Sequence, residues 1–307
     1  MARNWNDMPN EVKWMIVDNM DIVTRTKLKM CSKSDKCIVE SVPMHVESFT
    51  ACHISELKEF EIDSFCLTKT EEGNLEETIN DKTYPYQLPK NLQKYDLKVF
   101  KKFVTNLLLP GNLQIDSFST DLDFPNKLSN TTIETKEATF YSKNEEIVKW
   151  LKVLSPKTKS IYIDGHETNM LEGLGQNSLI INAERLGISN ENDVTDEQLM
   201  TFKFTKGFIY DSKITRRGII QFIQKIASSD YPLNTRIEIF DVKESENNLT
   251  LEEEFLQTTR FCLPMNSEKE VVYYCDPHTY HFSICVQKAG RLVKTYDQLF
   301  GYQRLDE

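Results

Sequence analysis

"DMPNEVKWMIVDNMDIVTRTKLKMCSKSDKCIVES", residues 7–41, holds many large apolar side chains for so short a segment. The apolar residues at its start recur at helical spacing: Met8, Val12, Met15, Ile16 and Met20. Pro9 falls in the first turn, where its missing N–H costs nothing. The pattern predicts a short amphipathic helix.

Two more short helices are expected in the same segment. The spacing of Leu28 and Cys31 indicates one, and that of Ile38 and Val39 indicates the other. Ser34 or Asp35 is expected to cap the last helix. A domain below about 40 residues rarely buries enough surface to fold alone. We therefore expect another polypeptide to cover the apolar excess of this segment.

The order of residues in this segment resembles the F-box family. The family pattern is Leu-Pro, an acidic residue, an aliphatic pair one turn on, Leu-Asp, and then a helix that closes in Val-Ser-Lys. The corresponding residues here are Met8-Pro9, Glu11, Met15-Ile16, Met20-Asp21 and Cys31-Ser32-Lys33. Two methionines replace leucine and Cys31 replaces valine, and all three are apolar substitutions of tolerable volume.

The resemblance implies an incomplete helical bundle that binds a Skp-family adaptor and, through it, a cullin ubiquitin ligase. Six positions carry over as lying at that interface or supporting it: Met8, Pro9, Ile16, Met20, Leu28 and Cys31. The alternative is that some of these side chains close the small helical core instead.

The composition of the whole chain limits its partners. The 307 residues carry a formal net charge of -10, whereas binding to nucleic acid or anionic lipid relies on Lys and Arg. No stretch approaches the about 20 apolar residues of a membrane helix, and the first residues lack the features of a secretory signal. We expect an intracellular protein that binds neither nucleic acid nor membranes, with its seven cysteines as free thiols.

From residue 45 onward, short apolar strands alternate with amphipathic helices. Three passages look alike, at residues 100–119, 147–165 and 219–241. In each, a helix ends near a proline and an alternating strand follows. The strands are marked by Leu113, Ile115 and Phe118, by Ile161 and Ile163, and by Ile237 and Ile239. This degenerate repeat predicts helix–strand units that stack side by side, as in leucine-rich-repeat solenoids.

Local signals add detail to this region. Ser142 with Glu145 and Thr195 with Gln198 have the spacing of capping boxes. "VVYYC" and "YHFSICV" flank the turn signal "DPHT" at residues 276–279 and predict a hairpin. Residues 70–91 and 242–254 are predicted to be flexible loops. We expect an α/β (α+β) protein with an F-box-like domain at 1–44 and a repeat-like target-binding domain at 45–307.

Part of the second domain has its own resemblance. Residues 186–226, "LGISNENDVTDEQLMTFKFTKGFIYDSKITRRGIIQFIQKI", resemble the C-terminal FTH domain of the large nematode F-box group. The resemblance is most evident across residues 175–241. It implies an α/β domain that captures a protein target and carries no catalytic residues.

The search for reactive sites gives no catalytic motif, metal site or cofactor site. Four residues within a short span are possible zinc ligands: Cys275, His278, His281 and Cys285. In a hairpin, however, His281 and Cys285 share one strand face with Ser283 between them, so we expect ordinary sheet residues. "EGLGQNS" at 172–178 lacks the Walker lysine and the dinucleotide fingerprint and is read as a loop. The basic cluster "TRTKLK" at 24–29 is read as a solvated helix face.

The favoured function is a non-catalytic substrate receptor of a cullin-type SCF ubiquitin ligase, with an unidentified protein target. A first alternative is a hydrolase-like enzyme in the α/β region. A pocket that holds His166 or His281 with a carboxylate would favour it. A second alternative is a scaffold that dimerises through the same apolar helices.

Overall fold

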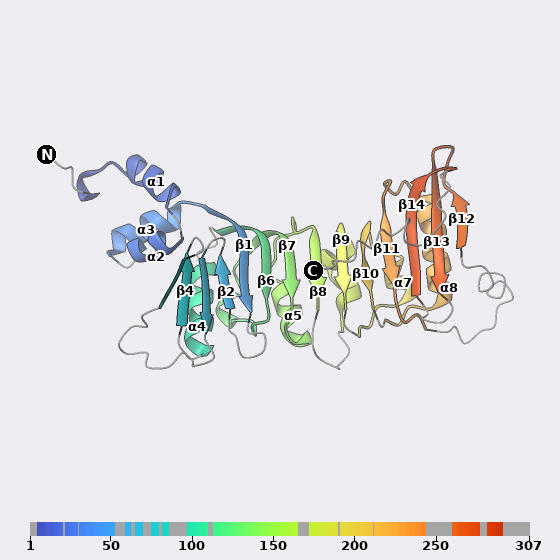
Figure 1. The fold of residues 1–307 in the computed structure, drawn as a ribbon, viewed down its shortest axis with the longest axis horizontal. Helices are drawn as coiled ribbons and strands as arrows, with labels where there is room; N and C mark the ends of the chain where they lie inside the picture. Colours follow the sequence, from blue (N-terminus) through green and yellow to red (C-terminus); the bar gives the residue numbers. More distant parts are fainter. Residues whose placement is uncertain are drawn as a thin grey trace. The chain divides into compact units, whose positions relative to one another are not determined.

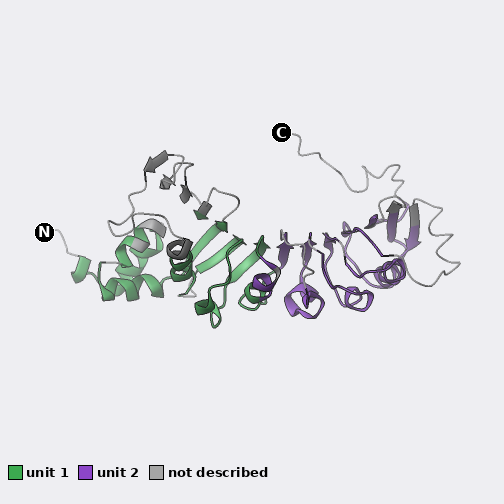
Figure 2. Ribbon diagram, turned by 90° about the horizontal axis from the view of Figure 1, so that it is seen from below, with its two compact units in different colours: residues 1–142, 149–158 green, residues 143–148, 159–307 purple. Residues whose placement is uncertain are grey.

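The computed structural model describes residues 5–20, 22–29, 31–52, 59–62, 65–69, 75–79, 82–85, 97–109, 113–164, 172–189, 191–210, 212–243, 260–276 and 281–290. The chain divides into two compact units (Figure 2). Unit 1 comprises residues 1–142 and 149–158, and unit 2 comprises residues 143–148 and 159–307. The predicted division at residues 44 and 45 stays a prediction.

The N-terminal segment of unit 1 forms the three expected helices after a short 3-10 turn (Figure 1). They are η1 (Trp5–Asp7), α1 (Asn10–Asp18), α2 (Ile22–Lys29) and α3 (Lys33–Ser41). A small core of their own joins them, made of Val17, Ile38, Val39 and Val42. The cap of α3 was wrongly predicted, because Ser32 fills that place and its Oγ accepts the N–H of Asp35.

The rest of unit 1 is built on seven strands. They are β1 (Met44–Cys52), β2 (Glu59–Ile62), β3 (Phe65–Lys69), β4 (Leu75–Ile79), β5 (Lys82–Pro85), β6 (Leu113–Thr120) and β7 (Glu134–Phe140). Their order is β7-β6-β1-β2-β3-β4-β5. β1, β6 and β7 pair in parallel, and β1 to β5 pair in antiparallel succession.

The prediction of a flexible loop at 70–91 is therefore wrong for the residues that form β4 and β5. Apolar alternation does not mark β4, since only Leu75 and Ile79 at its ends are aliphatic. The pairing with β3 and β5 supplies a hydrogen-bonding ladder that the local pattern does not reveal.

Aromatic side chains form the core of unit 1 beside α4 (Leu97–Leu108), η2 (Asn126–Leu128) and the last residues of α5 (Asn144–Leu151), whose first residues belong to unit 2. Phe118 stacks on Phe49 with ring centres 5.6 Å apart and lies 5.5 Å from Trp150. The Trp150 Nε1–H donates to the carbonyl of Leu122 at 2.8 Å. Ser142, predicted as a helix cap, also donates its hydroxyl to Leu122.

Unit 2 contains four parallel strands and an antiparallel extension. β8 (Ser160–Ile163), β9 (Arg185–Ile188), β10 (Lys206–Ile209) and β11 (Arg236–Ile239) pair in chain order. β14 (His281–Lys288) pairs antiparallel with β11, then with β13 (Lys269–Asp276), which pairs with β12 (Arg260–Pro264). The predicted hairpin is confirmed in β13 and β14, with residues 277–280 outside the described part.

The helices of unit 2 lie along one face of these strands (Figure 2). They are η3 (Leu174–Gln176), α6 (Ser178–Asn182), α7 (Asp196–Leu199) and α8 (Arg216–Ser228). Ile219, Phe222, Ile223 and Ile226 of α8 are almost fully buried, as are alternate residues of the strands such as Ile161, Leu186 and Ile237. The other strand positions therefore point to the opposite face of the sheet.

The predicted helices and strands of the three look-alike passages are all present, as α4 with β6, α5 with β8, and α8 with β11. The Thr195 and Gln198 capping box is confirmed at the start of α7. The second predicted loop, 242–254, lies mostly outside the described residues. In the segments that the structure describes, no helix has the length and apolar character needed to cross a membrane.

Candidate functional site

An exposed apolar face on α1 is the first candidate for a binding surface. Val12 and Met15 are 40% and 69% exposed, although both are large apolar residues. Ile16 lies beside them, because positions i, i+3 and i+4 are on one side of a helix. It is half-buried. Lys13 and Val17, on another side of α1, are buried instead. Helix α1 thus buries Lys13 and Val17 and directs the apolar side chains of Val12 and Met15 toward solvent.

The structure separates the six predicted interface residues into three groups. Met8 and Ile16 are half-buried and Pro9 is exposed as the N-cap of α1, so these three adjoin the exposed face. Cys31 is exposed just after α2 and its Sγ–H donates to the carbonyl of Lys27. Met20 and Leu28 are partly buried and pack against the small core.

Sequence reasoning left Val12 and Met15 out of the predicted interface, although both belong to the helical periodicity of Met8 to Met20. The 3.6-residue period identifies apolar positions on a helix. It does not tell which of two adjacent apolar sides faces the domain's own core. The exposed fractions make that distinction.

A hydrogen-bonded cluster fixes the start of the segment against α3. The Trp5 Nε1–H donates to Asp35 Oδ1 at 2.7 Å, and the Ser32 hydroxyl donates to Asp35 Oδ2 at 2.7 Å. These donors, Ser32 foremost and then Trp5, lower the pKa of the Asp35 carboxyl. Lys13 lies over the Trp5 ring, 5.7 Å from its centre, and its charge acts on the Asp35 pKa in the same direction.

Arg25 joins the ends of the helices through backbone carbonyls. The residue is only 5% exposed, and its side-chain nitrogens donate to the carbonyls of Asp18, Met20, Val42 and Pro43 at 3.1 to 3.2 Å. Burial lowers the pKa of Arg25, and the charge of Asp18 opposes that shift. The prediction of a solvated basic face is wrong for this residue, which is a structural cross-link.

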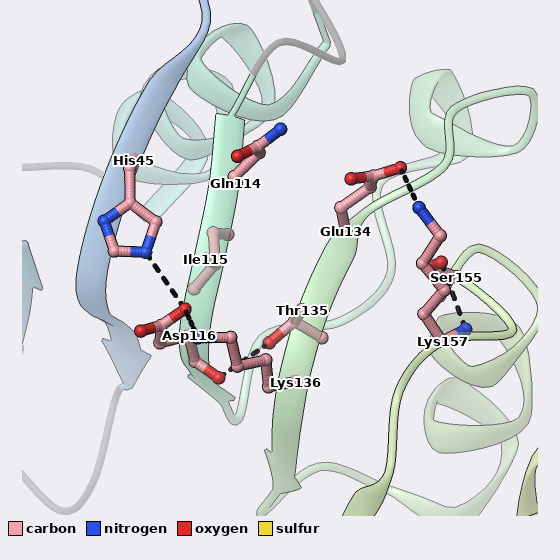
Figure 3. Close-up of a pocket in the computed structure, with 9 residues that line it drawn as sticks. All are labelled: His45, Gln114, Ile115, Asp116, Glu134, Thr135, Lys136, Ser155 and Lys157. Atoms are coloured by element: carbon pink, nitrogen blue, oxygen red, sulfur yellow. Dashed lines mark hydrogen bonds and ion pairs between the residues drawn. The ribbon is translucent and has the colours of Figure 1, made fainter.

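A pocket of about 290 Å³ in unit 1 is the second candidate site (Figure 3). Residues of β1, β6 and β7 line it together with the segment after α5. They are His45, Gln114, Ile115, Asp116, Glu134, Thr135, Lys136, Ser155 and Lys157. Val46 and Ile115 are buried, and Phe49 and Phe118, three residues further along their strands, are buried as well, so the alternation shifts by one residue here. Asp116 directly follows the buried Ile115 and lies between His45 and Lys136.

The pocket is organised around ion pairs. Asp116 Oδ1 lies 3.0 Å from His45 Nε2 and 2.8 Å from Lys136 Nζ. Hydrogen bonds from Lys136 and then His45 lower the pKa of Asp116, which keeps this carboxyl ionised and unsuited to act as a general acid. Figure 3 places Ser155 beyond β7, on the far side of β6 from His45. The pocket therefore does not assemble a serine, histidine and carboxylate for nucleophilic catalysis.

The two histidines expected in an enzyme pocket give no such arrangement in the described residues. His166 lies outside them. His281 stacks on Phe240 with ring centres 4.0 Å apart, and its Nε2 lies 3.1 Å from Ser283 Oγ.

The register of β11 and β14 puts His281 and Cys285 on one sheet face, as expected. His278 and the side chain of Cys275 lie outside the described part. Within that part, no group of three or more potential metal ligands converges.

The comparisons with known proteins bear on the N-terminal helices. The family model of the F-box domain matches residues 5–47, which include η1, α1, α2 and α3. A search of curated proteins gave no match to the chain.

Proposed function

We propose that the protein is a non-catalytic substrate-receptor subunit of a cullin-type SCF ubiquitin ligase. The observation that carries the proposal is the F-box match at residues 5–47. F-box domains bind Skp-type adaptors and thereby cullins. The exposed face of α1 supports the same role, because a solvent-exposed Met15 and Val12 on so small a helical unit are typical of a protein interface.

In this proposal the adaptor covers the exposed face of α1. Met8, Pro9, Val12, Met15 and Ile16 make the contact. Met20 and Leu28 hold the helix from the core side, and Cys31 borders the contact just after α2. Aromatic and methionine side chains are enriched in interfaces, and a few of them carry most of the binding energy.

Residues 45–307 serve in this proposal as the target-binding domain. Four parallel strands with a helical segment between successive members support a helix–strand repeat similar to leucine-rich-repeat proteins. The resemblance of residues 175–241 to FTH domains of the nematode F-box group is part of the same proposal. The mechanism is tethering, in which the receptor raises the effective concentration of target lysines beside the ubiquitin-conjugating enzyme.

Co-expression with a Skp-family adaptor and a cullin tests the proposal. We expect the full chain to co-purify with both proteins and the Met15→Asp variant to lose both. Trp14→Asp is a matched control, since Trp14 is also exposed but lies about 100° round the helix from Met15. The control is expected to retain the complex.

The oligomeric state of the chain without the adaptor separates this proposal from the dimerising scaffold. We expect a monomer by light scattering. A dimer that Met15→Asp converts to a monomer, together with no adaptor binding by the full chain, would favour the scaffold.

A further inference from the structure

The sheet face of unit 2 that lies opposite the helices carries a continuous set of aromatic side chains. Tyr162, Phe208, Tyr210 and Phe240 are half-buried on β8, on β10 and just after β10 and β11. The rings of Tyr210 and Phe240 stack with centres 4.0 Å apart, and Phe240 stacks in turn on His281. Aromatic faces at this exposure offer a large apolar contact area.

Gly187 of β9 makes the continuity of the rings possible. It pairs with Tyr162 on one side and with Phe208 on the other. A Cβ at this position would lie 2.6 Å from Tyr162 Cδ1 and 2.9 Å from Phe208 Cζ. The two rings therefore close over the glycine backbone from the neighbouring strands.

A row of basic residues borders the rings on the same face. Arg185, Lys206 and Arg236 are register partners on β9, β10 and β11, and all three are exposed. Neighbouring strands lie about 4.8 Å apart, and like charges directly opposite one another destabilise a sheet. The row is also opposite in sign to the chain as a whole, which has a net charge of -10. The row presents cationic groups that an anionic ligand can meet.

The face is not accessible at its β14 end, because the side chains there are buried. Glu238 of β11 is half-buried between Phe208 and Ser283, and burial raises the pKa of this carboxyl while Arg236 lowers it. Ser283 and Cys285 of β14 are buried. The accessible part is therefore the region of β8 to β11, which we call the Tyr162–Phe240 face: Tyr162, Phe208, Tyr210 and Phe240 with Arg185, Lys206 and Arg236.

We propose that the Tyr162–Phe240 face binds an acidic segment of the target polypeptide. Carboxylates of the segment meet the basic row, and its aromatic or aliphatic side chains pack on the rings. This inference rests on the proposed function, whose target-binding domain it makes specific. A peptide fits better than nucleic acid, because a phosphate backbone needs many cationic contacts, whereas the face offers three cations with Glu238 beside them.

Fluorescence anisotropy with the full chain tests this inference. The probe is a pool of short fluorescein-labelled peptides in which Asp or Glu alternates with Tyr, Phe or Leu. A matched pool with Lys at the acidic positions and a labelled oligothymidylate are the comparison ligands. We expect the acidic pool to bind and to weaken with rising salt, and neither comparison ligand to bind.

Lys206→Glu is the decisive variant. It places a carboxylate between Arg185 and Arg236, so the protein should keep or raise its unfolding temperature while the acidic pool binds about tenfold more weakly. Lys213→Glu makes the same change in net charge at another exposed site in unit 2 and should leave binding unchanged. Phe208→Ala should also weaken binding.

Three results would overturn the inference. One is equal binding of the acidic and basic pools, and another is an equal effect of Lys206→Glu and Lys213→Glu. The third is binding of oligothymidylate with the same dependence on Lys206. Adaptor binding measured on the same proteins keeps the two proposals apart, because Lys206→Glu should retain the adaptor and Met15→Asp should retain the acidic pool.

Discussion

Arg25 satisfies more backbone carbonyls than a helix-surface arginine ordinarily does. Its guanidinium donates hydrogen bonds to backbone carbonyls near the end of α1, such as that of Met20, and after α3, such as that of Val42. Removing it leaves buried acceptors without a donor, and each such loss costs free energy because water cannot replace the arginine in the folded state. The stability of the three helices should therefore depend on this one side chain.

Arg25→Ala is expected to lower the free energy of unfolding of the N-terminal helices by about 2 to 4 kcal/mol. Hydrogen exchange of the amides in α1 and α3 measures it. Arg25→Lys should recover only part of the loss, since an ammonium cannot reproduce the planar fork of donors. Unchanged amide protection in Arg25→Ala would contradict this role.

Asp35 should make the same helices sensitive to acid. The pKa of its carboxyl is lowered in the folded protein by Ser32 and then Trp5. A lowered folded pKa contributes stability above the unfolded pKa of about 4, and this contribution disappears as the pH falls through the folded value. We expect the unfolding temperature of the helices to drop on acidification below about pH 4.

The variant Asp35→Asn should be less stable at neutral pH and should lose much of this acid dependence. Thermal unfolding followed at neutral and acidic pH measures both effects. Asp7→Asn, at an exposed carboxyl in η1, is the control and should behave like the unmodified chain. An equal pH profile for Asp35→Asn and the unmodified chain would show that the Asp35 bonds contribute nothing.

At the scale of elements, the junction of α7 and α8 has one unusual feature. Asp196 of α7 accepts the N–H and the hydroxyl of Thr215, the N-cap of α8, at 2.7 and 2.6 Å. A Cβ on Gly218 would lie 2.0 Å from Asp196 Oδ1. The glycine in the first turn of α8 is therefore required by the neighbouring carboxylate.

Gly218→Ala should destabilise unit 2, opposite to the gain of about 1 kcal/mol that this change gives in an open helix. Urea unfolding should show a loss of about 1 to 3 kcal/mol, because the carboxylate must leave its two donors. In the Asp196→Gly background, which removes the Asp196 Cβ together with the carboxylate, the same change should cost much less. A stabilising effect of Gly218→Ala in the unmodified chain would refute the steric argument.

Element prediction succeeded where the apolar period is strong and failed where pairing partners are distant in sequence. The helix–strand passages around Ile161 and Ile237 follow directly from alternation and from prolines between the elements. The strands β2 to β5 form one antiparallel run beside β1, and their polar residues carry little local signal. The cap at Ser32 was missed because Asp35, three residues later, is also a residue type that caps helices. The two side chains are hydrogen-bonded to each other.

The candidate binding surfaces were predicted only in part. The F-box resemblance selected Met8 and Ile16, which are half-buried at and just before α1, but it also selected Met20 and Leu28, which pack on the core. The Tyr162–Phe240 face was not predicted at all. It is assembled from four strands that are separated by helices, and only the register of β8 to β11 brings Arg185, Lys206 and Arg236 together.

In the proposed receptor each unit of the molecule makes a different contact. The N-terminal helices of unit 1 offer an apolar surface to a ligase adaptor, and unit 2 offers an aromatic and basic surface to a target. A receptor that works by tethering needs both contacts at once. Substitutions in one surface should therefore leave binding at the other unchanged, because no residue belongs to both.

The central claim is that the exposed face of α1 is the adaptor interface. Titration calorimetry of the purified chain with a purified Skp-family adaptor tests it most directly. We expect Met15→Asp to weaken the binding free energy by about 2 to 4 kcal/mol, which raises the dissociation constant, and Trp14→Asp to leave the dissociation constant unchanged. Equal affinity of the Met15→Asp variant and the unmodified chain would contradict the claim.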